Sequence, residues 1–310
     1  MISGLFALDS NYLSFRITPL FEIATGRITE YVFDPNCKNT DNKISELDWN
    51  VSTIALAGFS ADFEIIRYLH LGLQTKFGVG QRSDFMQDYD WLNSVTPAWQ
   101  DEDPAENTNF SEHINKLDKA VDFKISAGGN LYLPLEMQLT PYLSYKYEFI
   151  RFTATGGYSE YKQNNYEKKQ FEGNVISYEQ EINTLLLGLN FQAKGIPRTR
   201  IMMDFAISPY LTSLKATDYH YLRNTAFRDS FKNLLQIESD LCAQYCFTKN
   251  HAAGIYGRIQ YIPLSQGTTA YTSIDKQGNF LSDNWTDDES GFGGTERFIW
   301  SLGLNYSFSL

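Results

Sequence analysis

The C-terminal segment, residues 297–310, alternates between apolar and mostly polar side chains. A period of two indicates a β-strand with one apolar and one mostly polar face. Strands of soluble sandwiches usually have about 5–6 residues, so this segment is too long for that fold. It is typical of a barrel strand, placed where it can close against the first strand of the chain. Its apolar positions are Phe298, Trp300, Leu302, Leu304, Tyr306, Phe308 and Leu310.

The same alternation recurs along the chain and indicates an all-β protein. Three further segments, 69–79, 139–149 and 201–211, each place large apolar residues on one face. The sequence has no apolar run of about 18 residues, which excludes a transmembrane helix. The mean hydropathy of −0.35 remains compatible with a membrane barrel, because alternating strands average out as moderately polar. The aromatic content of 15% suits the interfacial girdles of such barrels.

The connections between these strands alternate in length. Short turns are predicted near 60–62, 133–135, 195–197 and 249–251. Longer polar stretches lie near 34–43, 84–112, 157–173, 216–226 and 271–292. These connections separate ten strands, and outer-membrane barrels combine long outer loops with short periplasmic turns in this way. We therefore predict that residues 1–310 form a single domain, a ten-stranded antiparallel transmembrane β-barrel with long extracellular loops and short periplasmic turns.

Strand length predicts that part of the barrel stands outside the membrane. Each predicted strand has roughly twenty residues, whereas a bilayer requires only about 9–11. At about 3.3 Å per residue and a tilt of about 45°, about 20 Å should project beyond the lipid on the extracellular side. Ten strands enclose a lumen that side chains largely fill, which argues against a wide porin channel.

The formal net charge of −11 argues against a nucleic-acid partner, because phosphates are bound by Lys and Arg. It suits cationic partners, although a solvated acidic surface is the simpler explanation of the charge alone. Cys37, Cys242 and Cys246 are odd in number and lack a metal-site spacing, so we interpret them as small structural residues. Residues 1–7 do not form a complete signal peptide, so we expect a mature or truncated chain of an exported protein.

Two clusters of ionisable side chains are candidates for chemistry. Asp88 and Asp90 are placed in the second long loop, and Asp218 and His220 in the fourth. A spacing of two puts both members of each pair on one strand face, and the order of the loops puts both pairs on the same side of the membrane. Asp218 would orient His220 as a general base, while two close carboxylates would share a proton near neutrality. No metal site is expected, since neither cluster has a Cys or a second His beside it.

The same residues also have a simpler explanation. Two Asp residues in a loop are more often solvated or turn-forming, and a lone His in a loop is usually only a polar residue. From spacing alone, catalysis is therefore the less favoured interpretation. The alternative is a non-catalytic barrel that acts as an adhesin or surface-binding protein, and a small channel is a third interpretation.

Several short stretches, taken in order, give the chain a resemblance to the omptins, outer-membrane endoproteases with a ten-stranded barrel. The likeness runs from about residue 20 to the C-terminus, and the order and spacing of the stretches make it specific. The stretches are Ser45-Glu46-Leu47-Asp48-Trp49, Asp88-Tyr89-Asp90-Trp91, Trp99 followed by Asp101-Glu102, Phe152-Thr153-Ala154-Thr155-Gly156-Gly157, Asp218-Tyr219-His220-Tyr221 and Gly303-Leu304-Asn305-Tyr306-Ser307-Phe308.

The resemblance implies an endopeptidase of the bacterial outer membrane in which an Asp pair and an Asp–His pair activate a water molecule. Asp218 and His220 match the base pair. Asp88 and Asp90 match the pair that assists the water and the developing oxyanion. No covalent intermediate, metal or cofactor is implied, and the active site is expected to face the extracellular side.

Omptins cut next to basic residues, often between two of them, and the resemblance extends to that preference. Glu30 matches one acid of the primary pocket, although an ordinary strand-end acid is the alternative. Asp101 matches the acid that receives the residue after the cut. The second acid of the primary pocket falls on Ala216, a departure that argues against strict basic selectivity. Cationic peptides or surface-exposed proteins are the expected substrates, and a monomer is the expected state.

Omptins also need lipopolysaccharide on the outer wall of the barrel. Tyr145 and Lys232 match two of the lipid-binding positions. Tyr147, Phe149 and Glu181 stand where the family has Glu, Arg and Arg. Because most of the basic phosphate-binding set is absent, we expect either a different outer-membrane lipid or activity that is independent of lipid. Lipopolysaccharide is the candidate activator to test.

Overall fold

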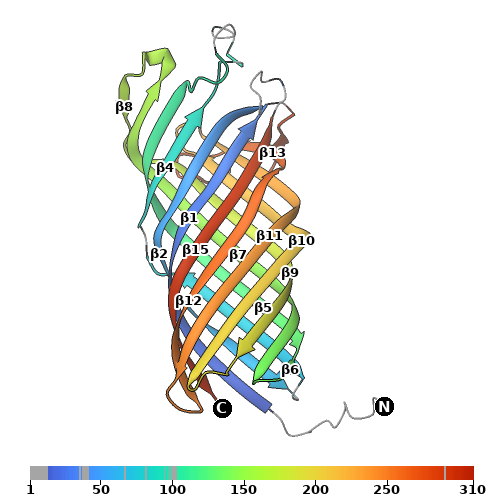
Figure 1. Ribbon diagram of the computed structural model, residues 1–310. Coiled ribbons are helices and arrows are strands. Elements are labelled where there is room, and N and C mark those ends of the chain that lie inside the picture. The colour runs from blue at the N-terminus through green and yellow to red at the C-terminus, as the bar shows by residue number, and fades with distance from the viewer. Residues whose placement is uncertain are drawn as a thin grey trace.

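The protein is a tall β-barrel of tilted antiparallel strands (Figure 1). The computed structural model describes residues 13–34, 36, 42–65, 68–80, 82–93, 95, 96, 98, 103–289 and 291–310. Residues 1–7, Cys37 and Asp101 lie outside this part of the chain, and so do the predictions that concern them. Among the described residues, no helix has the length and apolar character needed to cross a lipid bilayer.

Ten positions form the ring, eight of them filled by one long strand and two by consecutive shorter strands, which confirms the predicted ten-stranded barrel. The eight long strands are β1 (Leu13–Phe33), β2 (Lys43–Ile65), β5 (Asn109–Gly129), β7 (Met137–Tyr161), β9 (Asn174–Ala193), β10 (Thr199–His220), β11 (Thr225–Cys246) and β15 (Phe292–Ser309). The interrupted positions are β3 (Leu69–Gly78) with β4 (Arg82–Asp90), and β12 (His251–Gln266) with β13 (Thr268–Ser273). Pairing of β10 with β11 and of β1 with β15 closes the ring.

The short elements mark the two ends of the barrel. We call the end with β6 (Leu131–Leu133) and the C-terminus the turn end, and the end with β8 (Lys168–Gln170) and β13 the loop end (Figure 1). The short strand β14 (Thr286–Asp287) pairs with β13 at the loop end. A 3-10 turn, η2 (Lys162–Asn164), follows β7 and precedes β8 at the loop end. The predicted turns near 133–135, 195–197 and 249–251 lie between strands at the turn end, as expected.

Two predictions about the connections are wrong. Residues 60–62 lie within β2 rather than in a turn, because Asp62 accepts a hydrogen bond from Nε of Arg16 at 3.1 Å on the paired strand β1. The strands also extend further into the predicted long loops than expected. β4 continues to Asp90, and only residues 221–224 connect β10 to β11. Ladder hydrogen bonds therefore hold segments whose polar composition had suggested loops.

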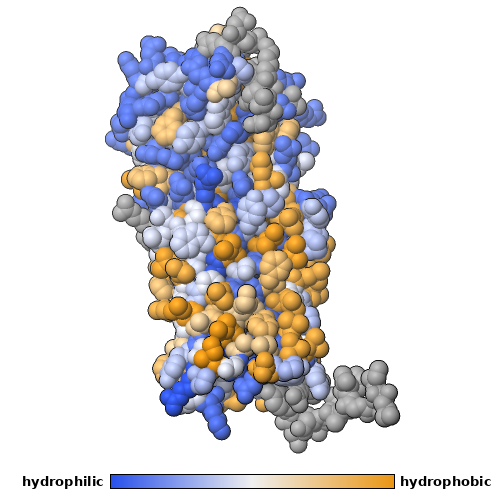
Figure 2. All heavy atoms as spheres, in the orientation of Figure 1, coloured by the Kyte–Doolittle hydropathy of each residue, from blue (hydrophilic) through white to orange (hydrophobic). Residues whose placement is uncertain are grey.

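A belt of exposed apolar side chains surrounds the half of the barrel nearer the turn end. Figure 2 shows this half as mostly hydrophobic, whereas the loop end is mostly hydrophilic. Such a belt is typical of a barrel surface that faces lipid. Members of the belt include Leu143, Leu187, Phe205, Leu241, Ile255 and Leu302.

Side chains fill the lumen in layers. The residues along β7 show the order of these layers from the turn end to the loop end. Lys146 and Glu148 belong to a buried network of charges, in which Lys146 Nζ lies 3.2 Å from Oε2 of Glu148. Ile150, Phe152 and Ala154 follow toward the loop end and belong to an apolar core. A cavity of about 230 Å³ remains on the turn side of the charges. The apolar core thus forms a floor between the charged layer and the loop end of the lumen, which we call the mouth.

Candidate functional site

Both predicted ionisable pairs lie at the loop end of the barrel, on strands rather than on loops. β4 carries Asp88 and Asp90, and β10 carries Asp218 and His220. Alternation along a strand turns both members of each pair toward the same face. In the ring, β5, β7 and β9 separate the two strands, so the pairs approach the mouth from different sides.

Asp218 and His220 form a direct pair. Nε2 of His220 is hydrogen-bonded to Oδ2 of Asp218, and the Asp218 side chain is buried. Oδ1 of Asp218 is buried without a hydrogen-bond partner in the described chain. The ring of Phe227 meets the imidazole edge-on, with centroids 5.3 Å apart. The carboxylate and this aromatic contact together fix the orientation of the imidazole.

Asp88 and Asp90 form the second pair, half-buried at the mouth. Ser45 Oγ donates to Oδ1 of Asp88 at 3.4 Å, and Asn109 Nδ2 donates to Oδ2 of Asp90 at 3.2 Å. Burial raises the pKa of Asp88 well above its ordinary value, and the charge of Asp90 raises it further. Burial also raises the pKa of Asp90. Two close carboxylates in such surroundings retain a proton at a pH where an isolated Asp is ionised.

The two pairs interact through their charges across the mouth. The charge of Asp218 contributes to the raised pKa of Asp88. A positive His220 acts in the opposite direction and lowers the pKa of Asp90. Arg223, in the turn between β10 and β11, lowers the pKa of both carboxyl groups on β4. The two pairs, far apart in the sequence, therefore lie within electrostatic reach of one another at the loop end.

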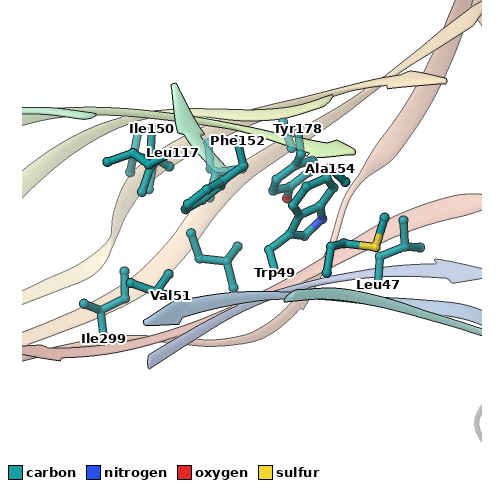
Figure 3. Close-up of a cluster of buried hydrophobic side chains, with 14 of the residues drawn as sticks. Leu47, Trp49, Val51, Leu117, Ile150, Phe152, Ala154, Tyr178 and Ile299 are labelled. Carbon is teal, nitrogen blue, oxygen red and sulfur yellow. The ribbon is translucent and has the colours of Figure 1, made fainter. Parts of the chain in front are cut away.

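Glu30 lies deeper in the same mouth and is 4% exposed. Burial raises the pKa of Glu30 well above its ordinary value, and the charges of Asp218 and Asp229 raise it further. Below it, the rings of Trp49 and Tyr178 stack with centroids 5.2 Å apart. In Figure 3 the aromatic side chains from opposite walls of the barrel meet in this floor. Glu30 is thus a buried acid that interacts with Asp218 rather than an exposed acid at a strand end, and its role in binding substrate stays a prediction.

The predicted lipid-binding residues lie on the outer wall, away from the mouth. Tyr145 is exposed on β7, where its hydroxyl donates to Oδ1 of Asn183 at 2.6 Å. Lys232 is exposed on β11, and β9 and β10 lie between the two strands. Cys242 and Cys246, also on β11, are free thiols.

Asp229 is a further buried acid at the candidate site, and no motif in the sequence predicts it. It lies on β11, is 6% exposed, and accepts a hydrogen bond from Oγ1 of Thr269 at 2.6 Å. The ladder pairs it directly with Ala216 on β10. This pairing follows from the position of the turn at 221–224, because strand residues pair in order outward from a turn. The sequence predicted a longer loop there, so the pairing could not be derived from it. Within the described chain, no group of three or more His, Cys, Asp or Glu side chains is arranged to hold a metal ion.

Comparisons with known proteins agree with this architecture. The crystal structure of the outer membrane protease OmpT from Escherichia coli superimposes with a TM-score of 0.80 at 20% identity, covering 98% of this chain and 99% of that one, and this supports the fold. The plasminogen activator of Yersinia pestis is 25% identical over 299 residues, which are 95% of this chain and 90% of the relative. The outer membrane protease OmpP of Escherichia coli (strain K12) is 26% identical, with coverage of 92% and 87%. A model of the Omptin family matches residues 20–308, and the chain therefore belongs to the omptin family.

Proposed function

We propose that this chain is an outer-membrane endopeptidase that hydrolyses peptide bonds next to basic residues with a water molecule activated by Asp218 and His220. The observation that carries the proposal is that two ionisable pairs at one mouth interact through their charges, above an apolar floor. Family membership and the protease names of relatives support the reaction class. The barrel architecture supports residence in the outer membrane.

His220 is the proposed general base. Because Nε2 is bound to Asp218, Nδ1 is the nitrogen left to take a proton from water. The water oxygen bonds to the carbonyl carbon of the substrate as this proton passes to the imidazole, and Asp218 stabilises the imidazolium that forms. The imidazolium then returns the proton to the leaving amine as the C–N bond breaks.

Asp88 and Asp90 are the proposed assistants of the water and the carbonyl oxygen. Their raised pKa values favour a state in which the pair keeps one proton near neutrality. The protonated group can donate a hydrogen bond to the oxygen that becomes negative, and the ionised group can orient the water. Acid and base functions then face each other around a single water molecule.

The proposed orientation places the site outside the cell. The apolar belt lies nearer the turn end, so the loop end with its charged mouth projects beyond the lipid (Figure 2). Cationic peptides and surface-exposed proteins are the proposed substrates, because a net charge of −11 attracts positively charged chains. Glu30, buried in the mouth, is proposed to receive a basic side chain. We propose that the protein acts as a monomer.

Peptide cleavage tests the function. The protein is refolded in detergent and given a fluorogenic peptide with one Arg-Arg or Arg-Lys bond, and mass spectrometry of the products locates the cut. We expect cleavage beside Arg, and a rate lower by about 10²–10³-fold in Asp88→Ala, as for the loss of one group that stabilises the developing charge. Asp283→Ala, which removes an exposed acid from the connection between β13 and β14, should match the wild type. Equal rates in all three proteins would favour the adhesin, and steady conductance in planar bilayers would favour a channel.

We also propose that the activity does not depend on lipopolysaccharide. Glu181 pairs with Phe149 in the ladder on the outer wall, where a phosphate group would require cations. Adding lipopolysaccharide to the purified protein should leave the cleavage rate unchanged. The variant Glu181→Arg should respond more strongly, because it adds a cation to that wall. A large rise in wild-type activity on adding the lipid would contradict the proposal.

A further inference from the structure

We propose that Asp229 is the second acid of the pocket that receives the basic side chain before the cut bond, in place of the acid that the family carries at the position of Ala216. Its ligand is the ammonium or guanidinium group of a Lys or Arg side chain in the substrate. The inference rests on the proposed function, since it concerns the selectivity of the same site. It reverses the expectation that Ala216 removes strict basic selectivity.

Strand register places Asp229 beside the position that has lost its acid. β10 and β11 form a hairpin whose ladder pairs Ala216 with Asp229. Both residues are buried, at 2% and 6% exposure. Directly paired residues have Cβ atoms about 4.5–5.5 Å apart, so a carboxylate moved from one residue to the other remains in the same pocket.

Asp229 and Glu30 approach the pocket from different strands and lie close to one another. The charge of Asp229 raises the pKa of Glu30, after burial and Asp218. Both charges also add to the effect of burial in raising the pKa of Tyr178, whose ring forms part of the floor. Two acids, one on β11 and one on β1, therefore flank the same phenol at the base of the mouth.

Strand β15, which lies beyond β12 and β13 from β11 in the ring, leaves room for the Asp229 carboxylate. Gly293 lies on β15, and a Cβ added there would stand 2.1 Å from Cγ of Asp229, so a side chain at this position would displace the acid. Oγ1 of Thr269 holds the carboxylate from β13 at 2.6 Å. Two residues beyond Gly293, Thr295 pairs with Glu30 in the ladder. Thus β15, which makes room for Asp229, is paired with β1, which carries Glu30.

The pocket holds two acids that its own described residues leave without a cationic partner. Oε2 of Glu30 is buried and has no hydrogen-bond partner within the described chain. Neither Glu30 nor Asp229 forms an ion pair with a Lys, Arg or His of the described residues. Burial raises the pKa of Asp229 to about 7. A buried acid is stabilised when a partner brings the opposite charge and hydrogen-bond donors, which a Lys or Arg side chain supplies.

Selectivity measurements test the inference. Two fluorogenic peptides differ only in the residue before the cut bond, Arg in one and Gln in the other, and the ratio of their kcat/KM values is measured. We expect Asp229→Asn to lower the Arg-to-Gln ratio by about 10–100-fold, as for the loss of one charged hydrogen-bonding partner. Asp229→Asn/Ala216→Asp should recover the preference for Arg, because the acid returns on the paired strand. Glu167→Gln, which removes an exposed acid from the connection after β7, should leave the ratio unchanged.

The outcomes separate this inference from the function on which it rests. A wild type that cleaves neither peptide overturns the proposed function. A wild type that prefers Arg, with the same ratio in Asp229→Asn, overturns the role of Asp229 and leaves the peptidase standing. A ratio that falls in Asp229→Asn and stays low in the double variant shows that the two positions do not serve one pocket. Circular dichroism of each refolded variant confirms that the barrel has formed.

Discussion

Replacement of His220 by Ala is expected to lower kcat for a peptide with an Arg-Arg bond by about 10²–10⁴-fold, the usual contribution of a positioned general base. The imidazole is the group that takes the proton of the attacking water in the proposed reaction, and Asp218 orients it. KM should change little, because the basic side chain of the substrate is proposed to bind to Glu30, away from the imidazole. Initial rates over a range of substrate concentrations separate the two parameters.

His251→Ala is the matched control, since it removes a half-buried imidazole at the turn end, where His251 contacts Tyr306. Its kcat should equal that of the wild type. Asp218→Asn should also lose activity, because the amide keeps the shape of the carboxylate but not the charge that stabilises the imidazolium. Full activity in His220→Ala would remove the general base from the mechanism and would leave the two pairs without a catalytic role.

The sequence predicts the barrel best where one strand face meets lipid and the other meets the lumen. In the last strand, alternate residues from Phe298 to Tyr306 are exposed and apolar, which is the period of two on which the prediction depended. Beyond the apolar belt both faces of a strand can carry polar side chains, and the signal is lost. This explains why β4 and the end of β10 were predicted as loops. The wrong turn near Asp62 has a different reason. Asp is common in turns, but here Asp62 forms an ion pair with Arg16 inside the lumen.

The residues of the candidate site that form short motifs could be predicted from the sequence. The residue that reaches the site only through strand register could not. Asp88, Asp90, Asp218 and His220 stand in pairs spaced by two, so each pair marks itself in the sequence. Asp229 is a single acid with no motif around it. Its importance follows only from its ladder pairing with Ala216, which depends on the true length of the turn at 221–224.

Lys146→Met is expected to destabilise the barrel by about 3–5 kcal/mol, the usual cost of removing one partner from a buried ion pair. Lys146 is 1% exposed, and its ammonium lies 3.2 Å from Glu148 and 3.6 Å from Asp122, in addition to its bond with Glu238. Met has a similar volume, so the loss would come from uncompensated carboxylates rather than from a cavity. Urea titration of the refolded barrel, followed by Trp fluorescence, measures the change in unfolding free energy.

A second replacement shows whether charge is the cause. Glu238→Gln in the Lys146→Met background removes one of the carboxylates left without its closest cation, so it should restore part of the lost stability. Lys168→Met removes a Lys that pairs with Glu160 at the exposed loop end, and it should unfold at the same urea concentration as the wild type. The apolar core separates Lys146 from the mouth, so the folded fraction of Lys146→Met should keep the wild-type preference for Arg. If Lys146→Met and the wild type unfold at the same urea concentration, the ion pairs of Lys146 do not stabilise the barrel.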